Sequence, residues 1–179
     1  MADAMVRESL QANLKFRWTA LIRRRLEGLT DAEYLWEPAA GCLTIRRGGD
    51  GYVLDPVGST DIPLGNIAWR MAHLAFSLSS HPIAVVAFGP NWPRPDLAAP
   101  AGTVGEALAR LDSAHAHWEA ALGRLSDFDL ARNFGPAAGE YSTSTALDLV
   151  LHIHAEVLQR GADLCLLRDL YWHLHGRPA

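Results

Sequence analysis

The chain has 179 residues, of which 49% are hydrophobic and 20% charged, and 16 basic against 20 acidic side chains give a net charge of −4. This length fits one domain with its own core, so neither disulfides nor a structural metal are needed for stability. The slightly acidic balance offers no field for binding a phosphate backbone, which argues against nucleic acid as a partner.

Cysteine usage and apolar runs favour a soluble protein of a reducing compartment. Cys42 and Cys165 lie far apart in the sequence and form no CxxC pair, which disfavours a disulfide scaffold. The first ten residues lack the apolar core of a signal peptide. The longest apolar stretches, such as Ile83 to Phe88, are too short to span a bilayer. We therefore expect a cytoplasmic protein without a membrane partner.

The first predicted element is a long amphipathic helix between Val6 and Leu29 that ends at Gly28. A short helical segment should follow it, because Thr30 with Glu33 three residues later forms a capping-box pattern. The apolar face of the long helix is predicted to consist of Val6, Leu10, Leu14, Trp18, Leu21, Ile22 and Leu26.

A long connection is predicted over residues 39–61, which are rich in glycine and turn-forming residues. Short extended stretches are expected within it, around Leu43–Arg46 and Tyr52–Leu54. Connections of this length in a compact domain are often functional.

Three more helices follow the connection. Asp61 and Pro63 predict the N-cap and the first turn of a helix over 64–80. The third helix should start at Thr103 with a capping box, and the fourth should extend to about His173. Four amphipathic helices without a convincing set of strands predict an all-α four-helix bundle, with the long connection between helices 1 and 2.

One histidine stands out on the second predicted helix. His73 shares a helical face with Trp69, four residues before it, and with Phe76, three residues after it. A histidine between two aromatic side chains is expected to be at least half buried. It is either a core residue satisfied by one hydrogen bond or a functional group inside the bundle.

Several ionisable side chains share one face of the fourth predicted helix, because they are spaced three and four residues apart. They are either a polar ladder that points into the bundle or a solvated stripe, in which Glu156 and Arg160 form an ordinary i,i+4 ion pair. The full face reads Leu149, His152, Glu156, Arg160, Asp163 and Leu167.

Other histidines compete for a functional role. His154 lies about 200° around the helix from His152, so the two cannot bind one ion, and we expect His154 to be a packing or interface residue. His115 occupies an apolar-stripe position beside Trp118 on the third helix and either reaches the core or marks the edge of the stripe. His117 lies off that stripe and should be exposed.

Three segments in this order carry a more specific pattern: "GLTDAEYLWEP" at 28–38, "IAWRMAHLAF" at 67–76 and "LHIHAEVLQRGADLCLLRDLY" at 151–171. They resemble the DinB/YfiT-like superfamily in its actinobacterial branch, over essentially the whole chain. The resemblance implies an up-down-down-up four-helix bundle, one domain over residues 1–179 and a homodimer. Characterised relatives include mycothiol-dependent isomerases and bacillithiol-dependent transferases, which implies a low-molecular-weight thiol and a small-molecule substrate.

The resemblance also implies a divalent metal, zinc or nickel, held by three side chains. It assigns His73 as the ligand from the second helix and places Glu156 and Arg160 at the two ligand positions of the fourth. Arg160 departs from the pattern, because a guanidinium is always charged and has no lone pair to donate. Three outcomes are open. Arg160 pairs with Glu156 and replaces the metal, His152 or Asp163 substitutes as a ligand, or Arg160 binds an anionic ligand or thiol. We expect the first.

Two functions remain open from the sequence. The first is a thiol-linked transferase or isomerase relative with a degenerate metal site, for which His73, Glu156 and His152 are the candidate metal ligands and Arg160 the candidate cofactor-binding residue. The alternative is a metal-free ligand-binding protein or dimeric interaction module without catalytic activity.

Overall fold

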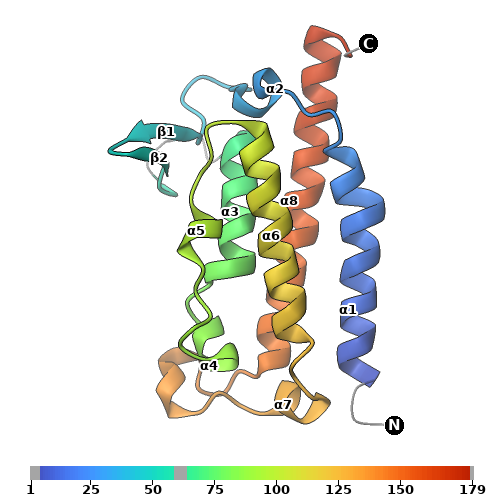
Figure 1. The fold of residues 1–179 in the computed structure, drawn as a ribbon, viewed down its shortest axis with the longest axis vertical. Coiled ribbons are helices and arrows are strands. Elements are labelled where there is room, and N and C mark those ends of the chain that lie inside the picture. The colour runs from blue at the N-terminus through green and yellow to red at the C-terminus, as the bar shows by residue number, and fades with distance from the viewer. Residues whose placement is uncertain (1–4, 59–63, 178–179) are drawn as a thin grey trace.

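Four long helical segments form a bundle in the computed structural model, which describes residues 5–58 and 64–177 (Figure 1). They run up, down, down and up in chain order, as the family resemblance implies, and the second of them, α3, packs against both α6 and α8. The segments are α1 (Met5–Arg17) with its continuation η1 (Trp18–Arg23), α3 (Ile67–Ser80), α6 (Val104–Leu122) and α8 (Ala146–His175).

The first helix differs from the prediction in its second half, where η1 is a π-helix. The buried residues of this segment stand four apart, and an α-helix turns about 40° too far over each such step. The wider π turn keeps them on one face. Val6 and Leu21 were expected on that face but are 41% and 47% exposed. The residues that are buried are Leu14, Trp18, Ile22 and Leu26.

The segment after the first helix folds largely as predicted. α2 (Asp31–Leu35) begins with the expected capping box between Thr30 and Glu33. In the long connection, β1 (Ile45–Gly48) and β2 (Gly51–Leu54) pair as an antiparallel hairpin, so the expected extended stretches are confirmed.

The second long helix starts later than predicted. Asn66 is the N-cap of α3, and its side-chain oxygen accepts a hydrogen bond from the backbone N–H of Trp69. The amide of Asn66 also donates to Oγ1 of Thr44 at 2.7 Å, which joins the helix start to the base of the hairpin. Asp61 and Pro63, predicted as the helix start, lie outside the described residues.

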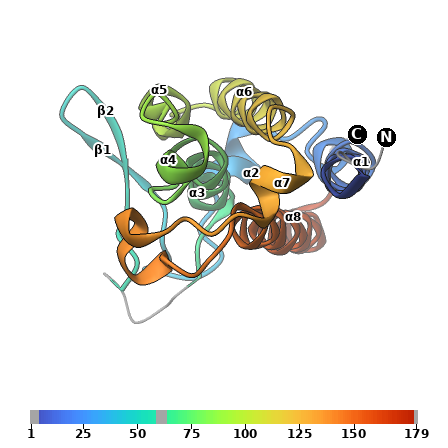
Figure 2. The ribbon, with the colours of Figure 1, turned by 90° about the horizontal axis from the view of Figure 1, so that it is seen from below.

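Short helical segments connect α3, α6 and α8, and all but one of them lie at the lower end of the bundle (Figure 2). The proline-rich connection after α3 contains two short helices, and Trp92, which lies between them in the chain, is buried. The short segments are α4 (Ala84–Phe88), α5 (Pro95–Ala98), α7 (Asp127–Ala131) and η2 (Pro136–Tyr141), of which η2 is a 3₁₀ segment. The exception is α5, which packs beside α3 and α6 about halfway up (Figure 1).

One segment, Ile67–Phe88, is long and apolar enough by composition to cross a membrane. It consists of α3 and α4, which are separated by a break after Ser80. In the fold, α3 packs against α6 and α8. A helix buried in a protein core has the same apolar composition as a membrane span, so this packing explains the hydropathy.

A buried ion pair joins α2 to the C-terminal part of α8. Nε of Arg168 on α8 donates to Oε1 of Glu33 on α2 at 3.1 Å, and the two residues are 3% and 0% exposed. The same guanidinium donates to the backbone carbonyls of Arg25 and Glu27. Arg168 therefore satisfies the carbonyls that the C-terminal end of the first helix leaves without partners.

Candidate functional site

His73 lies midway along α3 with one face against an aromatic ring. Its imidazole stacks on Trp69, with ring centroids 4.8 Å apart and planes 15° from parallel. Its Nδ1 atom is buried and has no hydrogen-bond partner among the described residues. Phe76, expected on the same face, is 38% exposed. The expected aromatic sandwich is therefore only half formed.

The ionisable face of α8 forms a partly buried charge network instead of a solvated stripe. Nε of Arg160 donates to Oε2 of Glu156 at 3.2 Å, and Nη1 of Arg160 lies 3.7 Å from Oδ2 of Asp163. The three side chains are 19–31% exposed. Asp163 also accepts a hydrogen bond from Arg70 on α3, so the network links the two helices.

Arg70 is a member of this site that the sequence analysis missed. Only 7% of it is exposed, and its Nε donates to the backbone carbonyl of Gly65 at 2.9 Å. Its position three residues before His73 places both on one side of α3, and that spacing is the signal that could have identified it. With Arg70 included, the site holds two guanidinium groups and two carboxylates.

This network affects the protonation of His73. Burial lowers its pKa below the ordinary value for histidine, and the positive charges of Arg160 and Arg70 lower it further, against the opposing effect of Glu156. The imidazole is therefore held neutral by its surroundings at neutral pH.

The residues at the inherited metal position do not fit a divalent cation. Arg160 occupies the third ligand position and already pairs with Glu156, the second, and its permanent charge would repel the ion. Among the residues that the structure describes, no three or more His, Cys, Asp or Glu side chains form a group that could hold a metal ion.

His152 lies in a separate part of the same helix face, where it meets His81 rather than His73. The two rings are in an edge contact, with centroids 5.6 Å apart and planes at 60°. Both line a pocket of about 240 Å³, whose other walls come mainly from the lower end of the fold. The pocket is completed by Ile83, Phe134, Tyr141, Ser144, Asp148 and Leu149.

A second polar cluster lies inside the bundle and contains His115, which is only 8% exposed. Its ring stacks on Trp18 of the π-helical segment, with centroids 4.2 Å apart. Nε2 of His115 and Oε1 of Glu119 are buried without hydrogen-bond partners and lie 3.9 Å apart. His115 therefore belongs to the contact of α6 with the first helix and takes no part in the His73 network.

Neither His154 nor His117 lies free on the surface of the bundle. His154 is 8% exposed and accepts a hydrogen bond from Nε1 of Trp118 at 3.3 Å, in line with a packing role. The prediction that His117 is exposed is wrong, because its ring stacks on Trp92 and its Nε2 hydrogen-bonds to the carbonyl of that residue.

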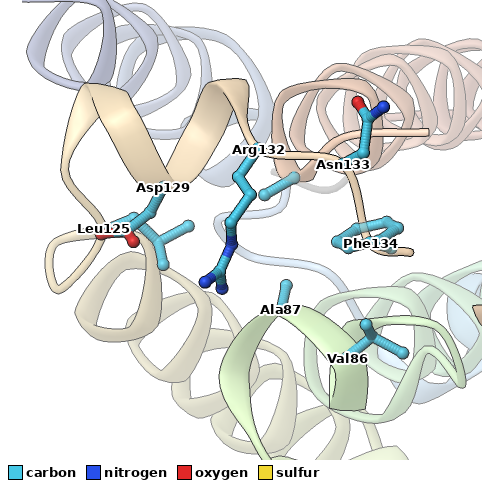
Figure 3. Close-up of a pocket in the computed structure, with 8 residues that line it drawn as sticks. Val86, Ala87, Leu125, Asp129, Arg132, Asn133 and Phe134 are labelled. Atoms are coloured by element: carbon cyan, nitrogen blue, oxygen red, sulfur yellow. The ribbon is translucent and has the colours of Figure 1, made fainter. Parts of the chain in front are cut away.

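A further pocket of about 190 Å³ lies on the other side of Phe134, at the lower end of the bundle (Figure 3). The guanidinium of Arg132 points into it, between Leu125 and Ala87. The carboxylate of Asp129 in its wall is occupied by hydrogen bonds from Ser126.

Comparison with known proteins gives one family match. The model of the DinB superfamily matches residues 14–163, a range that contains the whole His73 network and the His81–His152 pair. Neither a curated protein nor a solved structure matches the chain.

Proposed function

This chain belongs to the DinB superfamily, and from that premise we propose that it is a small-molecule-binding member in which an ion pair takes the place of the family metal. The observation that carries the proposal is the contact between Arg160 and Glu156 at the inherited ligand position. The charge of the guanidinium substitutes for that of the cation, and the side-chain charges of the site sum to zero.

The location of the nearest pocket supports a ligand on this face of the bundle. The pocket lined by His81 and His152 begins one turn along α8 from Glu156. It combines apolar walls with a few polar groups, as small-molecule sites usually do. Its volume of about 240 Å³ limits the ligand to a small organic molecule or to one end of a larger one.

The ion-pair part of the proposal is tested by restoring the missing ligand. Arg160→His should create zinc or nickel binding that depends on His73, because His73, Glu156 and the new imidazole then supply three donors. The parent chain should show no metal binding that His73→Ala removes. Arg124→His, at an exposed arginine outside the site, is the matched control. Equal His73-dependent binding in parent and variant would contradict the proposal.

The pocket part is tested by filling the pocket. Two probes, phenol and N-acetylcysteine, should shift the amide NMR signals of the pocket residues in the parent chain. Ser144→Trp, in the pocket wall, should abolish those shifts, whereas Thr143→Trp, exposed and outside the wall, should not. Failure of both probes, or equal effects of the two tryptophans, would count against a ligand in this pocket.

The same experiment addresses the thiol-linked transferase or isomerase function that the family resemblance suggests. If a mycothiol-type thiol is the partner, N-acetylcysteine should bind more tightly than N-acetylserine, which differs from it only at the sulfur atom. Arg160→Met should weaken that preference if Arg160 holds the thiolate. Equal binding of the two compounds favours a ligand without a thiol.

A dimeric interaction module is a second candidate, favoured by one face of α8. Apolar side chains spaced three or four residues apart are exposed along almost the whole helix, and Leu166 and Leu174 are 66% and 58% exposed. A continuous exposed apolar stripe usually marks an interaction surface. This surface, the α8 stripe, comprises Leu151, Ala155, Leu158, Ala162, Leu166, Leu170 and Leu174.

The pattern of the α8 stripe suits a second copy of the chain. Leu158 and Leu166 lie four residues on either side of Ala162, and Leu151 and Leu174 lie eleven and twelve residues from it. Antiparallel packing about a two-fold axis at Ala162 would therefore place leucine against leucine, with the small alanine at the point of closest approach.

A further inference from the structure

We propose that His81 and His152 form a transition-metal site of their own, displaced from the inherited His73 position. His81 follows the C-terminal end of α3 and His152 lies on α8, and both imidazoles line the small-molecule pocket. This inference rests on the proposed function only in sharing that pocket, and it stands or fails on different residues.

The separation of the two rings fits one shared ion. A nitrogen bound to zinc at 2.0–2.1 Å places the centre of its imidazole about 3.2 Å from the metal. Two imidazoles at tetrahedral or wider angles then have centroids about 5–6 Å apart. The observed separation is 5.6 Å, with the planes 60° apart, so the rings stand at the distance a shared cation requires, and side-chain rotation would have to turn one nitrogen of each toward it.

Neither ring is committed to another partner. His81 and His152 make no side-chain hydrogen bond to any other residue that the structure describes, and Nδ1 of His81 is buried without a partner. A buried, unpaired ring nitrogen is costly, and coordination is one way to satisfy a histidine in such a place. His152 is exposed, which leaves its ring free to rotate toward an incoming ion.

The charges around the pair favour a cation more than those around His73 do. Burial lowers the pKa values of both His73 and His81, and Glu156 opposes the decrease in each, whereas Arg160 and Arg70 lower the pKa of His73 alone. Around His81 the opposing positive influence comes from His152 alone, which is itself a ligand in the proposed site. Neutral imidazoles are the form that binds metal. The described residues supply two protein ligands, one fewer than a catalytic zinc site has, so water and the bound small molecule would complete the coordination.

The site is identified by two residues, so two single substitutions test it. Untagged protein is titrated with NiCl₂ or ZnCl₂ in the presence of a chromogenic chelator, and the number and affinity of bound ions are measured. His81→Ala and His152→Ala should each weaken binding by about tenfold or more, in line with the loss of one of two protein ligands. His73→Ala and His173→Ala, the latter at an exposed residue near the end of α8, should leave the affinity unchanged.

The outcomes separate this inference from the proposed function. Binding that is lost in His73→Ala would overturn both, because the inherited position would then hold the metal. Binding that is unaffected by His81→Ala or His152→Ala, or no binding by the parent chain, would overturn the displaced site alone. A second readout is thermal unfolding, because a ligand of the folded state raises the melting temperature. NiCl₂ should raise it in the parent and in His173→Ala but not in His81→Ala.

Discussion

Ile22 packs directly against the backbone of Gly161, so that a Cβ atom added to the glycine would lie 2.5 Å from Cδ1 of Ile22. The contact joins the π-helical segment η1 to the middle of α8. Because Gly161 has no side chain, the first helix packs closer to α8 than any other residue at this position would permit.

Gly161→Ala should therefore destabilise the protein although alanine favours helix. Overpacking of a tight contact costs about 1–3 kcal/mol, which exceeds the gain of up to about 1 kcal/mol from replacing a helical glycine. The free energy of unfolding in urea measures the difference. Gly105→Ala is the matched control, because no atom lies within 4 Å of the Cβ it would add to α6, and it should be neutral or stabilising. Equal effects at the two positions would contradict the close contact.

Removal of one member of the Glu33–Arg168 pair should be among the most destabilising single changes. Arg168→Met leaves the fully buried carboxylate of Glu33 without its partner, and loss of one member of a buried pair costs about 3–5 kcal/mol. The double variant with Glu33→Gln should recover part of the loss. Arg46→Met, at an exposed ion pair with Asp55, should cost less than about 1 kcal/mol. Urea unfolding of all variants provides the comparison.

The two core histidines predict a loss of stability in acid. Burial lowers the pKa values of His115 and His154 to about 4, whereas in the unfolded chain a histidine titrates near 6.5. Their stabilising effect is complete above about pH 6.5 and is lost as the pH falls toward 4, because only the unfolded state then binds the protons. The decrease in unfolding free energy is up to about 3 kcal/mol per histidine.

The control for this pH dependence must account for Glu119 beside His115. Burial raises the pKa of Glu119, so the folded state binds that proton first and the effect of Glu119 has the opposite sign. Unfolding free energies measured between pH 7 and 4 should fall less steeply in His115→Gln and His154→Gln than in the parent. His173→Gln, at an exposed position, should keep the parent slope. An unchanged slope in the double core variant would contradict the assignment.

A charge in the α8 stripe should break a homodimer. Leu166→Lys and Leu158→Lys should each raise the dissociation constant by about tenfold or more, because the lysine must be desolvated in the contact. Phe128→Lys replaces a residue that is 71% exposed on α7, and it should leave the constant unchanged. Sedimentation velocity at several concentrations measures it. Dissociation by Phe128→Lys but not by Leu166→Lys would place the interface elsewhere.

The bundle was predictable because its signals are local. Caps such as Thr30 with Glu33, and apolar side chains at regular spacing, act within one or two turns of helix. The four-residue spacing of Trp18, Ile22 and Leu26 fits a wider turn but does not by itself distinguish a π turn from an α-helix, because the segment also contacts His115 and Gly161, which are distant in the sequence. Tertiary packing, and not local preference, selects the wider turn.

In the candidate site, too, contacts within one helix were predictable and contacts between distant segments were not. Glu156 and Arg160 could be paired from their spacing alone, since both lie on one helix. The partner of His152 could not, because His81 lies just beyond the last turn of α3, where helical periodicity no longer predicts direction. The sequence analysis names both His73 and His152 as candidate metal ligands, but the two residues lie in separate environments in the fold.

The buried pair between Glu33 and Arg168 has a consequence for how the chain is made. The two residues are 135 positions apart, and at a synthesis rate of roughly 5–20 residues per second the ribosome needs about 7–27 s to pass from one to the other. Until Arg168 is synthesised, the carboxylate of Glu33 has no guanidinium to pair with. The burial of α2 must therefore follow the synthesis of the last third of α8. The bundle is therefore completed only when the C-terminal turns leave the exit tunnel, and fragments that stop short of them should depend on chaperones to remain in solution.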